Sequence, residues 1–352
     1  MYEAIQAQPD AFAAVIRANE GLVEQFAPVV ASCERLFVCG IGTSYHAALA
    51  GEHFVRCYGG GLPAHVWHSF DFALYGPDLT ARDCVVAVSH RGSKMYTAQS
   101  LKRAREAGCR TALIAGRGAS AKPGAADAVF YTVDQEKSAA HTVSYTGALA
   151  VLALLAERIG RLRSGASGLP EELLRRGLPA AIRGALSLEE EVAVLARQQG
   201  ERRRIWLAGG GPSAITAQEI ALKIKETSYA AAEGMPVEAM LHGPLQCAED
   251  EDLFVLIAPA GAAQERVRQL AQAVEAIGAP ALVLSDGSAE SIRDAAVALW
   301  NVPAVPEPFT VLTCLVPLQL FAYHLTLARG RNPDGFRLED PRFAKARDLV
   351  QL

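Results

Sequence analysis

Three ionisable side chains spaced along one helical pattern could carry out proton transfer. Glu219, Lys223 and Glu226 stand at i, i+4 and i+7 in the segment EIALKIKE, so they project from one face of a helix. A positioned carboxylate can act as a general base, and a lysine, unlike an arginine, can lose its proton. An exposed ladder of ion pairs is the simpler interpretation of this spacing and is the commoner arrangement in proteins.

Two further groups that could take part in acid–base chemistry lie outside this helix. His242 stands in the turn MLHGPL, shortly after Glu238, and Lys345 lies close to the carboxyl-terminal end. A lone histidine is more often structural than catalytic, and a lysine near a chain end is usually a solvated charge. Lysine is scarce here, however: only seven of the 34 basic residues are lysines, at positions 94, 102, 122, 137, 223, 225 and 345.

Two glycine-containing loops each follow an apolar segment and precede a helical pattern. The first, CGIGTS at 39–44, offers Gly42, Thr43 and Ser44. The second, SHRGSK at 89–94, offers two hydroxyl groups and two cations. Ligands of open α/β sheets bind beyond the carboxyl ends of the strands, where helix N-termini attract anions. Each loop alone could be a plain turn, with Ser93 as a helix N-cap in the second, but two in one half favour a phosphate site.

Short apolar segments alternate with helical patterns in both halves of the chain. Strands are expected at 36–39, 84–89, 111–115 and 128–133, and again at 204–208, 253–259, 281–284 and 298–302. Helices are expected at 1–30, 44–57, 94–107, 142–161, 180–199, 213–230, 263–277 and 309–328. Continuous apolar strands that alternate with helices are typical of parallel sheets covered on both faces. We therefore predict an α/β fold of two tandem, doubly wound parallel-sheet domains of flavodoxin-like type, produced by duplication of one unit.

The expected connection between the two domains is a segment rich in Gly, Ser, Pro and Arg. It covers residues 161–179 and reads RLRSGASGLPEELLRRGLP. We predict a first domain at 1–165 that binds the sugar phosphate. The second domain, at 166–352, would carry the catalytic helix and the carboxyl-terminal tail.

The composition limits the partners and the cellular location. The 352 residues are 51% apolar and 20% charged with a net charge of −4, so we expect a globular protein without a nucleic-acid or membrane partner. No stretch of about 18 apolar residues and no signal-peptide pattern is evident. Seven cysteines without a CxxC pair indicate a reduced, cytoplasmic protein. Neither a cluster with metal-ligand spacing nor a P-loop is present, so no metal and no cofactor are expected.

Taken together, these segments resemble the SIS (sugar isomerase) superfamily, and within it the isomerase half of glucosamine-6-phosphate synthase. The resemblance extends over nearly the whole chain. It is closest at 219–245 (EIALKIKETSYAAAEGMPVEAMLHGPL), 317–330 (PLQLFAYHLTLARG) and 340–350 (DPRFAKARDLV). Three well-spaced matches in the same order make it specific.

The resemblance implies a role for each candidate residue. Glu226 would move a proton between C1 and C2 of an open-chain sugar phosphate, with Lys223 and Glu219 tuning and orienting it. His242, supplied by the other subunit of a homodimer, would assist ring opening, and Lys345 would reach the sugar carbonyl. The implied substrate and phosphate contacts are Gly42, Thr43, Ser44, Ser89, His90, Arg91, Ser93, Lys94, Ala139, His141 and Ala344.

Several positions depart from the family pattern. The family's phosphate loop reads Ser-Gln-Ser-Gly-Glu-Thr, and here Arg91 and Lys94 replace its second Ser and its Thr. His141 stands in place of a sugar-contacting serine in EKSAAHT (136–142). The added positive charge suits an anionic ligand. The corresponding loop of the second half, APAGA at 258–262, offers neither hydroxyl groups nor cations, so one phosphate site per chain is expected.

The beginning of the chain bears on the type of reaction. MYEAIQAQP at 1–9 resembles the start of the isomerase half, without the glutaminase domain and its terminal cysteine. The resemblance therefore implies deamination or isomerisation of an amino-sugar phosphate, or cleavage of a ketosamine phosphate. Two alternatives stay open: a non-catalytic regulator that binds a sugar phosphate, and a synthase subunit that receives ammonia from a separate glutaminase.

Overall fold

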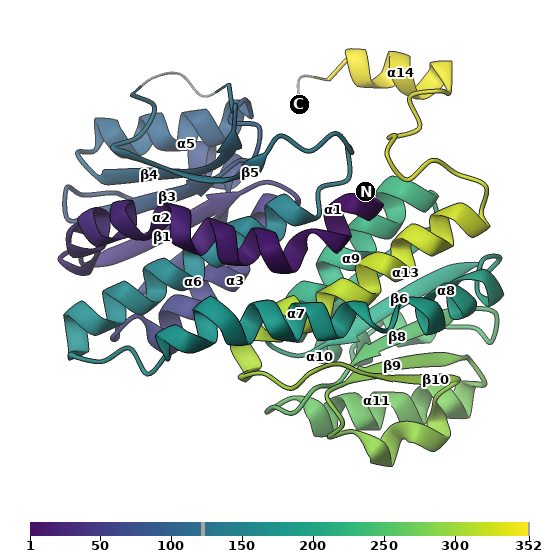
Figure 1. The fold of residues 1–352 in the computed structure, drawn as a ribbon. Helices are drawn as coiled ribbons and strands as arrows, with labels where there is room; N and C mark the ends of the chain where they lie inside the picture. The colour runs from purple at the N-terminus through teal and green to yellow at the C-terminus, as the bar shows by residue number, and fades with distance from the viewer. Residues whose placement is uncertain (121–123, 351–352) are drawn as a thin grey trace. The chain divides into compact units, whose positions relative to one another are not determined.

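The chain forms two compact units, each built around a parallel five-stranded sheet (Figure 1). The computed structural model describes residues 1–120 and 124–350. The β1–β5 unit comprises residues 7–136 and 141–179. The β6–β10 unit comprises residues 1–6, 137–140 and 180–350, so two short segments from the first half of the chain belong to the second sheet's unit.

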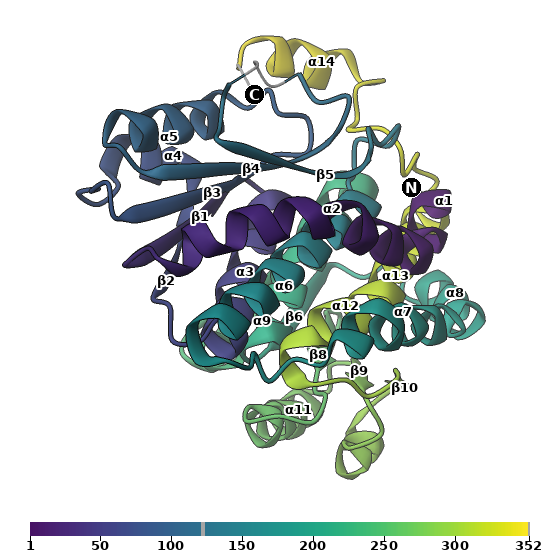
Figure 2. The same cartoon turned by 60° about the vertical axis from the view of Figure 1, so that its left-hand side comes forward.

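Helices cover both faces of the sheet in the β1–β5 unit, whose strand order is β2-β1-β3-β4-β5. On one face α2, α3 and α6 pack together, and α4 and α5 cover the other (Figure 2). The strands are β1 (Arg35–Gly40), β2 (Ala64–His68), β3 (Asp83–Val88), β4 (Arg110–Arg117) and β5 (Ala128–Asp134). The helices are α2 (Gln8–Ala31), α3 (Thr43–Tyr58), α4 (Ser69–Tyr75), α5 (Met95–Glu106) and α6 (Val143–Ser164), followed by the π-helical turn η1 (Leu173–Gly177).

The β6–β10 unit repeats this arrangement. Its strand order is β10-β9-β8-β6-β7, which corresponds strand for strand to that of the β1–β5 unit when it is taken from the β7 edge. Helices α8, α9 and α13 pack together on one face, and α10, α11 and η3 lie against one another on the other. The strands are β6 (Arg204–Gly209), β7 (Ala231–Pro236), β8 (Leu253–Ile257), β9 (Ala281–Ser285) and β10 (Ala298–Asn301). The helices are α1 (Tyr2–Gln6), α7 (Leu178–Leu186), α8 (Glu189–Gln198), α9 (Pro212–Ser228), α10 (Val237–Leu241), η2 (Pro244–Cys247), α11 (Gln264–Ile277), η3 (Glu290–Ala295), η4 (Glu307–Phe309), α12 (Thr310–Thr313), α13 (Leu315–Ala328) and α14 (Pro341–Asp348).

Corresponding turns of the two units have nearly the same backbone conformation. Gly42, before α3, has φ 58° and ψ −129°, and Gly211, before α9, has φ 54° and ψ −125°. A Cβ atom at Gly40 would collide with the main chain of Ser44, and one at Gly209 would collide with Ser213. The helix therefore begins directly against the strand end in both units. Together with the common strand order, this confirms the prediction of two tandem parallel-sheet domains.

The sequence missed one strand in each unit, and both are edge strands. β2 pairs only with β1, and most of its residues are partly exposed, so it lacks a continuous apolar run. β7 reads AAEGMP and pairs only with β6. Its Gly234 lies so close to α9 that a Cβ atom would collide with the main chain of Ala217. Because β2 is partly exposed and β7 contains a glycine at a close approach to a helix, neither has the continuous apolar pattern by which the central strands were recognised.

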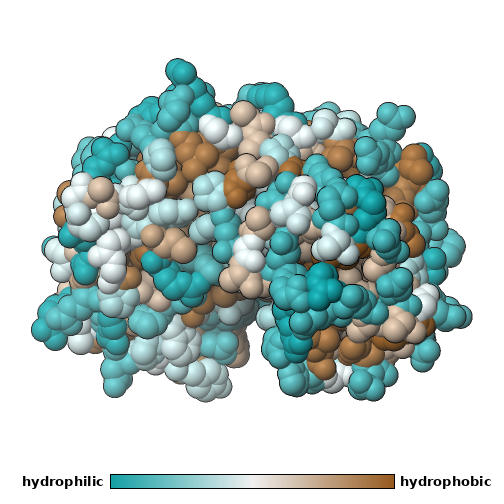
Figure 3. All heavy atoms as spheres, turned by 90° about the horizontal axis from the view of Figure 1, so that it is seen from below, coloured by the Kyte–Doolittle hydropathy of each residue, from teal (hydrophilic) through white to brown (hydrophobic). Residues whose placement is uncertain are grey.

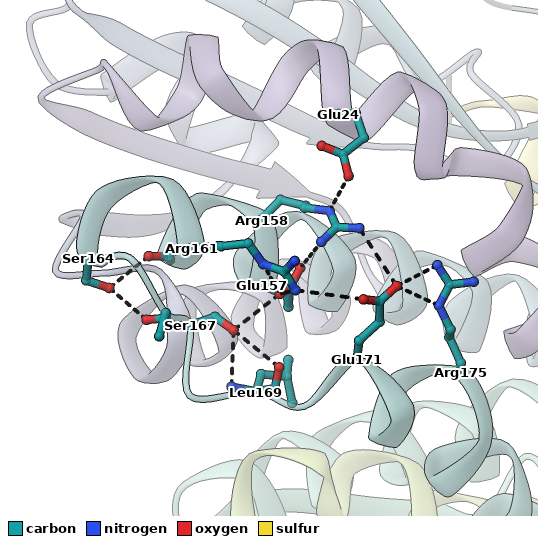
Figure 4. Close-up of polar contacts among 11 residues, drawn as sticks. Glu24, Glu157, Arg158, Arg161, Ser164, Ser167, Leu169, Glu171 and Arg175 are labelled. Atoms are coloured by element: carbon teal, nitrogen blue, oxygen red, sulfur yellow. Dashed lines mark hydrogen bonds and ion pairs between the residues drawn. The ribbon is translucent and has the colours of Figure 1, made fainter.

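A network of ion pairs holds the end of α6 to the segment that follows it (Figure 4). Glu157 is buried and accepts hydrogen bonds from Arg158 (3.1 Å) and from Nε of Arg161 (3.0 Å). Arg158 also pairs with Glu24 of α2 at 2.7 Å, and Glu171 completes the network. Residues 165–171 are thereby attached to the β1–β5 unit rather than forming a free linker.

Two helical stretches are long and apolar enough to cross a membrane by length and composition alone. They are 143–164 and 307–328. Their most apolar windows are 100% and 78% buried inside the structure, as is usual for the core helices of a water-soluble fold. On the face drawn in Figure 3, the exposed apolar side chains form separate patches among hydrophilic ones.

Candidate functional site

The two predicted phosphate loops lie at the point of the first sheet where the strand order reverses. The loop with Gly42 follows β1, and the loop that begins with Ser89 follows β3, which pairs with β1. Helices α3 and α5 then start at Thr43 and Met95. Such a switch point is where parallel α/β sheets bind their ligands. The first three residues of the candidate cradle, Gly42, Thr43 and Ser44, stand at the N-terminus of α3.

His90 is fixed by its neighbours as a neutral imidazole. The residue is only 7% exposed, and Nε2 accepts a hydrogen bond from the main-chain N–H of Glu136 at 3.2 Å. Burial lowers the pKa of His90, more than the Glu136 carboxylate raises it. The ring packs against Gly116, where a Cβ atom would collide with it. His90 therefore contributes hydrogen bonding and shape rather than positive charge.

The position of His141 depends on the same glutamate. The carboxylate of Glu136 accepts hydrogen bonds from the main-chain N–H groups of Thr142 (3.1 Å) and Ser144 (2.9 Å), at the start of α6. The rings of His90 and His141 meet edge to face with centroids 4.9 Å apart. Thr43, Ser44, His90, His141 and Tyr145 line one small cavity of about 10 Å³, which is room for a single water molecule.

The other side of the second loop faces a larger pocket. Ser89, Gly92 and Ser93 line a pocket of about 780 Å³ together with residues of α5, among them Lys102 and Arg105. Arg91 is exposed, and Lys94 is half-buried at the N-cap of α5 without a side-chain capping bond. The alternative in which Ser93 is the N-cap is therefore not observed. The structure divides the predicted cradle between a small inner cavity and this outer pocket.

The three ionisable groups of α9 are not an exposed ladder. Glu219 and Lys223 are buried, with side chains 0% and 1% exposed, and the side chain of Glu226 is 22% exposed. The ammonium group of Lys223 pairs with Glu219 at 3.6 Å and makes a short hydrogen bond to Glu226. Burying charges is costly, so such a cluster is not explained as a solvated helix surface. The carboxylate of Glu226 is therefore partly open to solvent, and the buried ammonium group of Lys223 lies beside it.

His242 has an acidic partner, Glu238, one helical turn earlier in the chain. It ends α10, its side chain is 71% exposed, and Nε2 lies 2.9 Å from Oε1 of Glu238. Arg266 of α11 also binds Glu238, with Nε at 2.7 Å from Oε2. Hydrogen bonds from Arg266 first and His242 second lower the pKa of Glu238 to about 2, so this carboxylate stays ionised beside the imidazole.

The remaining predicted site residues belong to the β6–β10 unit. Lys345 is exposed and Ala344 half-buried on α14, a helix in which no residue is buried. Ala139 is half-buried, and its N–H donates to the carbonyl of Asp334 at 3.2 Å. Ala139, Ala344 and Lys345 thus share a unit with the α9 cluster rather than with the phosphate loops.

The sequence interpretation missed residues that hold the predicted ones in place. Glu136 positions both histidines, and Gln135 donates to the carbonyl of His90 at 3.0 Å. Tyr145 lines the inner cavity, and Arg266 binds the partner of His242. Their signals were weak because each acts through a main-chain group or through an element distant in sequence.

Comparison with known proteins gives both halves the same description. Residues 30–158 and 200–329 each match the family model of the SIS domain. The chain is 32% identical over 336 residues to glutamine–fructose-6-phosphate aminotransferase [isomerizing] from Pyrococcus horikoshii, which covers 95% of this chain and 56% of that protein. It is 34% identical over 313 residues to the protein of that name from Gloeobacter violaceus, covering 86% of this chain and 51% of the relative. The chain thus spans about half the length of these relatives.

Solved structures support the fold. The C-terminal domain of glucosamine-fructose-6-phosphate aminotransferase from Francisella tularensis superposes with a TM-score of 0.87 at 22% identity, over 95% of this chain and 97% of that one. Glucosamine-6-phosphate deaminase from Thermotoga maritima gives a TM-score of 0.77 at 19% identity, over 95% and 96%. At such identities the likeness concerns the architecture alone.

Proposed function

Because this chain belongs to the SIS domain family in both of its halves, we propose that it is a phosphosugar enzyme that moves a proton between C1 and C2 of its substrate. The buried Glu219–Lys223–Glu226 cluster is the observation that carries the proposal. Aldose–ketose exchange needs a base that takes a proton from one carbon and returns it to the next. Glu226, the most exposed member of the cluster, is the group proposed to do this.

The neighbours of Glu226 have distinct proposed roles. Lys223 holds the Glu226 carboxylate in one orientation, and Glu219 compensates the charge of Lys223 on its other side. Thr227 donates to the carbonyl of Lys223 at 2.9 Å, and Thr326 of α13 donates to Thr227 at 2.7 Å. These bonds fasten this turn of α9 to α13, so the carboxylate is carried by a rigid element.

The phosphate-binding role is proposed for the β1–β5 unit. Its two loops offer main-chain N–H groups, the hydroxyl groups of Thr43, Ser44 and Ser93, and the cation of Lys94 beside helix N-termini. Such donors suit a phosphate monoester. The corresponding loop of the β6–β10 unit lacks them, since it reads APAGA. This difference favours one strand-end cradle for the phosphate of the substrate in each chain, in the β1–β5 unit.

For the reaction, we propose deamination or isomerisation of an amino-sugar phosphate, or cleavage of a ketosamine phosphate. Lys345 would act on the open-chain carbonyl, and His242 would assist ring opening in the site of a homodimer partner. The Glu238 carboxylate, which lies 2.9 Å from Nε2 of His242, supports this role because it orients the imidazole ring. Seven free cysteines support a reduced, cytoplasmic location.

Ammonia release tests this proposal. Purified protein would be incubated with glucosamine 6-phosphate and, separately, with fructosamine 6-phosphate. We expect release from one of them, and its loss in Glu226→Gln. If neither compound releases ammonia or isomerises while both raise the thermal midpoint, a non-catalytic sugar-phosphate regulator replaces the proposal.

A second candidate is the synthase reaction with ammonia supplied from elsewhere. The relatives named aminotransferases match along 95% of this chain with about half of their own length, which favours it. Formation of glucosamine 6-phosphate from fructose 6-phosphate and ammonium salts would support this candidate. If no glucosamine 6-phosphate forms while the protein releases ammonia from glucosamine 6-phosphate, the synthase candidate is excluded.

A further inference from the structure

We propose that a pocket at the carboxyl-terminal end of α9 is a second anion-binding site, suited to a phosphate group. The pocket has a volume of about 390 Å³ and lies wholly within the β6–β10 unit. It does not include any residue of the predicted phosphate cradle. The residues that line it are Glu201, Ser228, Tyr229, Arg329, Arg331 and Arg337.

Two guanidinium groups converge on one aromatic ring in this pocket. Arg331 lies 5.7 Å and Arg337 lies 5.3 Å from the centroid of the Tyr229 ring. Arg329 lines the same space. Like charges held together repel one another, so this arrangement is stabilised when an anion lies among them. Arginine is also the side chain whose planar donors match the oxygens of a phosphate.

The carboxylates around the pocket neutralise these cations only in part. Glu339 accepts from the Tyr229 hydroxyl at 3.3 Å. Asp340 lies 3.8 Å from Arg337, but its two oxygens are bound by Arg342 at 3.0 and 2.7 Å. Glu201 lines the pocket, yet within residues 1–120 and 124–350 no ion pair joins a carboxylate to Arg329 or Arg331. Positive charge is therefore in excess.

The backbone at this pocket is held in an uncommon conformation. Tyr229 has φ 60° and Arg337 has φ 55°, and these are the two non-glycine residues with positive φ in the part of the chain that the structure describes. Such conformations are strained for residues with a side chain and are retained where the surroundings require them. Both occur at one pocket, although the residues are far apart in sequence. Their combination orients the Tyr229 ring and the Arg337 guanidinium toward the same space.

Compensation of helix dipoles is a simpler explanation for one of the arginines only. Arg329 ends α13, and its Nη1 donates to the carbonyl of Gly200 at 2.6 Å, as expected of a cation near helix ends. Arg337 lies well beyond that helix and instead stacks on the ring of Phe343 at 4.0 Å. Phe343 belongs to α14. A bound anion would therefore link the end of α9 to the segment that carries α14.

Hydrogen exchange of the full chain with and without inorganic phosphate tests this site. We expect slower exchange at 226–232 and 329–343 when phosphate is added. The double variant Arg331→Ala/Arg337→Ala should lose this protection and bind phosphate at this site about tenfold or more weakly by calorimetry. Arg293→Ala removes an exposed arginine of the same unit that pairs with Glu290, and should behave as the parent chain.

The result that would overturn the proposal is also specific to particular segments of the chain. The site does not exist if phosphate slows exchange at 42–46 and 89–95 but not at 226–232 and 329–343, or if the double variant keeps the protection. Glucosamine 6-phosphate is run beside inorganic phosphate, and protection by either supports the site. Protection by the sugar phosphate alone identifies the ligand as an organic phosphate. Binding of inorganic phosphate is measured without turnover, so that result is independent of the proposed enzymatic activity.

Discussion

Lys223 pairs with Glu226 one turn further along α9, and the lysine side chain is 1% exposed while the glutamate is 22% exposed. The short hydrogen bond between them fixes a carboxylate at the border between the protein interior and solvent. Glu219, fully buried, neutralises the lysine from the other side. This relationship distinguishes the helix from the surface ion-pair ladder that has the same sequence spacing.

The first prediction concerns stability. Lys223→Met leaves Glu219 buried without its cation, and we expect the free energy of unfolding to fall by about 3–5 kcal/mol. Urea denaturation followed by circular dichroism measures it. Lys225→Met, which replaces an exposed lysine two positions away, serves as the matched control and should change stability little. Equal effects of the two substitutions would show that the buried ion pairs do not contribute as described.

The second prediction separates binding from turnover. Glu226→Gln keeps the size of the side chain but removes the base, so kcat should fall by about 100-fold or more while KM changes little. Lys345→Ala should also bind the sugar phosphate and lose most turnover. Glu233→Gln, on an exposed position of β7, and Lys225→Ala are the controls. Wild-type kcat in Lys345→Ala would remove that lysine from the mechanism.

The third prediction concerns pH. Burial holds the pKa of His90 below its ordinary value of 6.5 in the folded chain. The unfolded chain therefore binds more protons between these two pKa values, and stability is lost as the pH falls below about 6.5. His90→Gln should flatten this dependence in denaturation curves collected at several pH values. Burial also lowers the pKa values of His53 and His324, and both histidines are present in the parent chain and in His90→Gln. They contribute to the pH dependence in the same direction in both proteins, so the difference between the two denaturation series isolates His90.

A control for the third prediction is His65→Gln, which removes an exposed histidine of β2. It should leave the pH dependence of the parent chain in place. If the parent and His90→Gln lose stability with the same slope below pH 6.5, the imidazole of His90 is not neutral in the folded chain.

The fourth prediction tests whether His242 acts across a dimer. Glu226→Gln and His242→Asn chains are each expected to be inactive. When the two are mixed and allowed to exchange subunits, a mixed dimer regains one intact site if His242 is supplied by the partner. Random exchange should then restore about one quarter of the wild-type activity. Continued inactivity of a demonstrated mixed dimer would place His242 and Glu226 of the same chain in one site.

The central architecture could be predicted because buried parallel strands have a continuous apolar pattern. β1, β3, β6 and β8 were recognised in this way, and β1, β3 and β8 each lead into a loop considered for ligand binding. The edge strands β2 and β7 could not be recognised, because their exposed residues interrupt that pattern. The buried central strands were therefore all recognised, whereas of the partly exposed edge strands only β5 and β10 were.

The site was predictable to the extent that its residues lie close together in sequence. The spacing of Glu219, Lys223 and Glu226 predicted a common helix face, but only the packing of α9 shows that this face is buried. Glu136 could not be recognised as the residue that positions two histidines, because it holds His90 through its own main-chain N–H and the segment after His141 through the main-chain N–H of Thr142. The pocket around Tyr229 combines residues from three separate segments, so no local sequence pattern predicts it.

Exchange of solvent deuterium into the sugar phosphate tests the proposed proton transfer most directly. The chain would be incubated in D₂O with fructose 6-phosphate and, separately, with glucosamine 6-phosphate, and the C1 and C2 protons followed by NMR. We predict incorporation at C1 or C2 with the parent chain and none with Glu226→Gln, whichever net reaction the enzyme performs. Absence of exchange with the parent chain, while the sugar phosphates bind, or undiminished exchange in Glu226→Gln, would contradict the account.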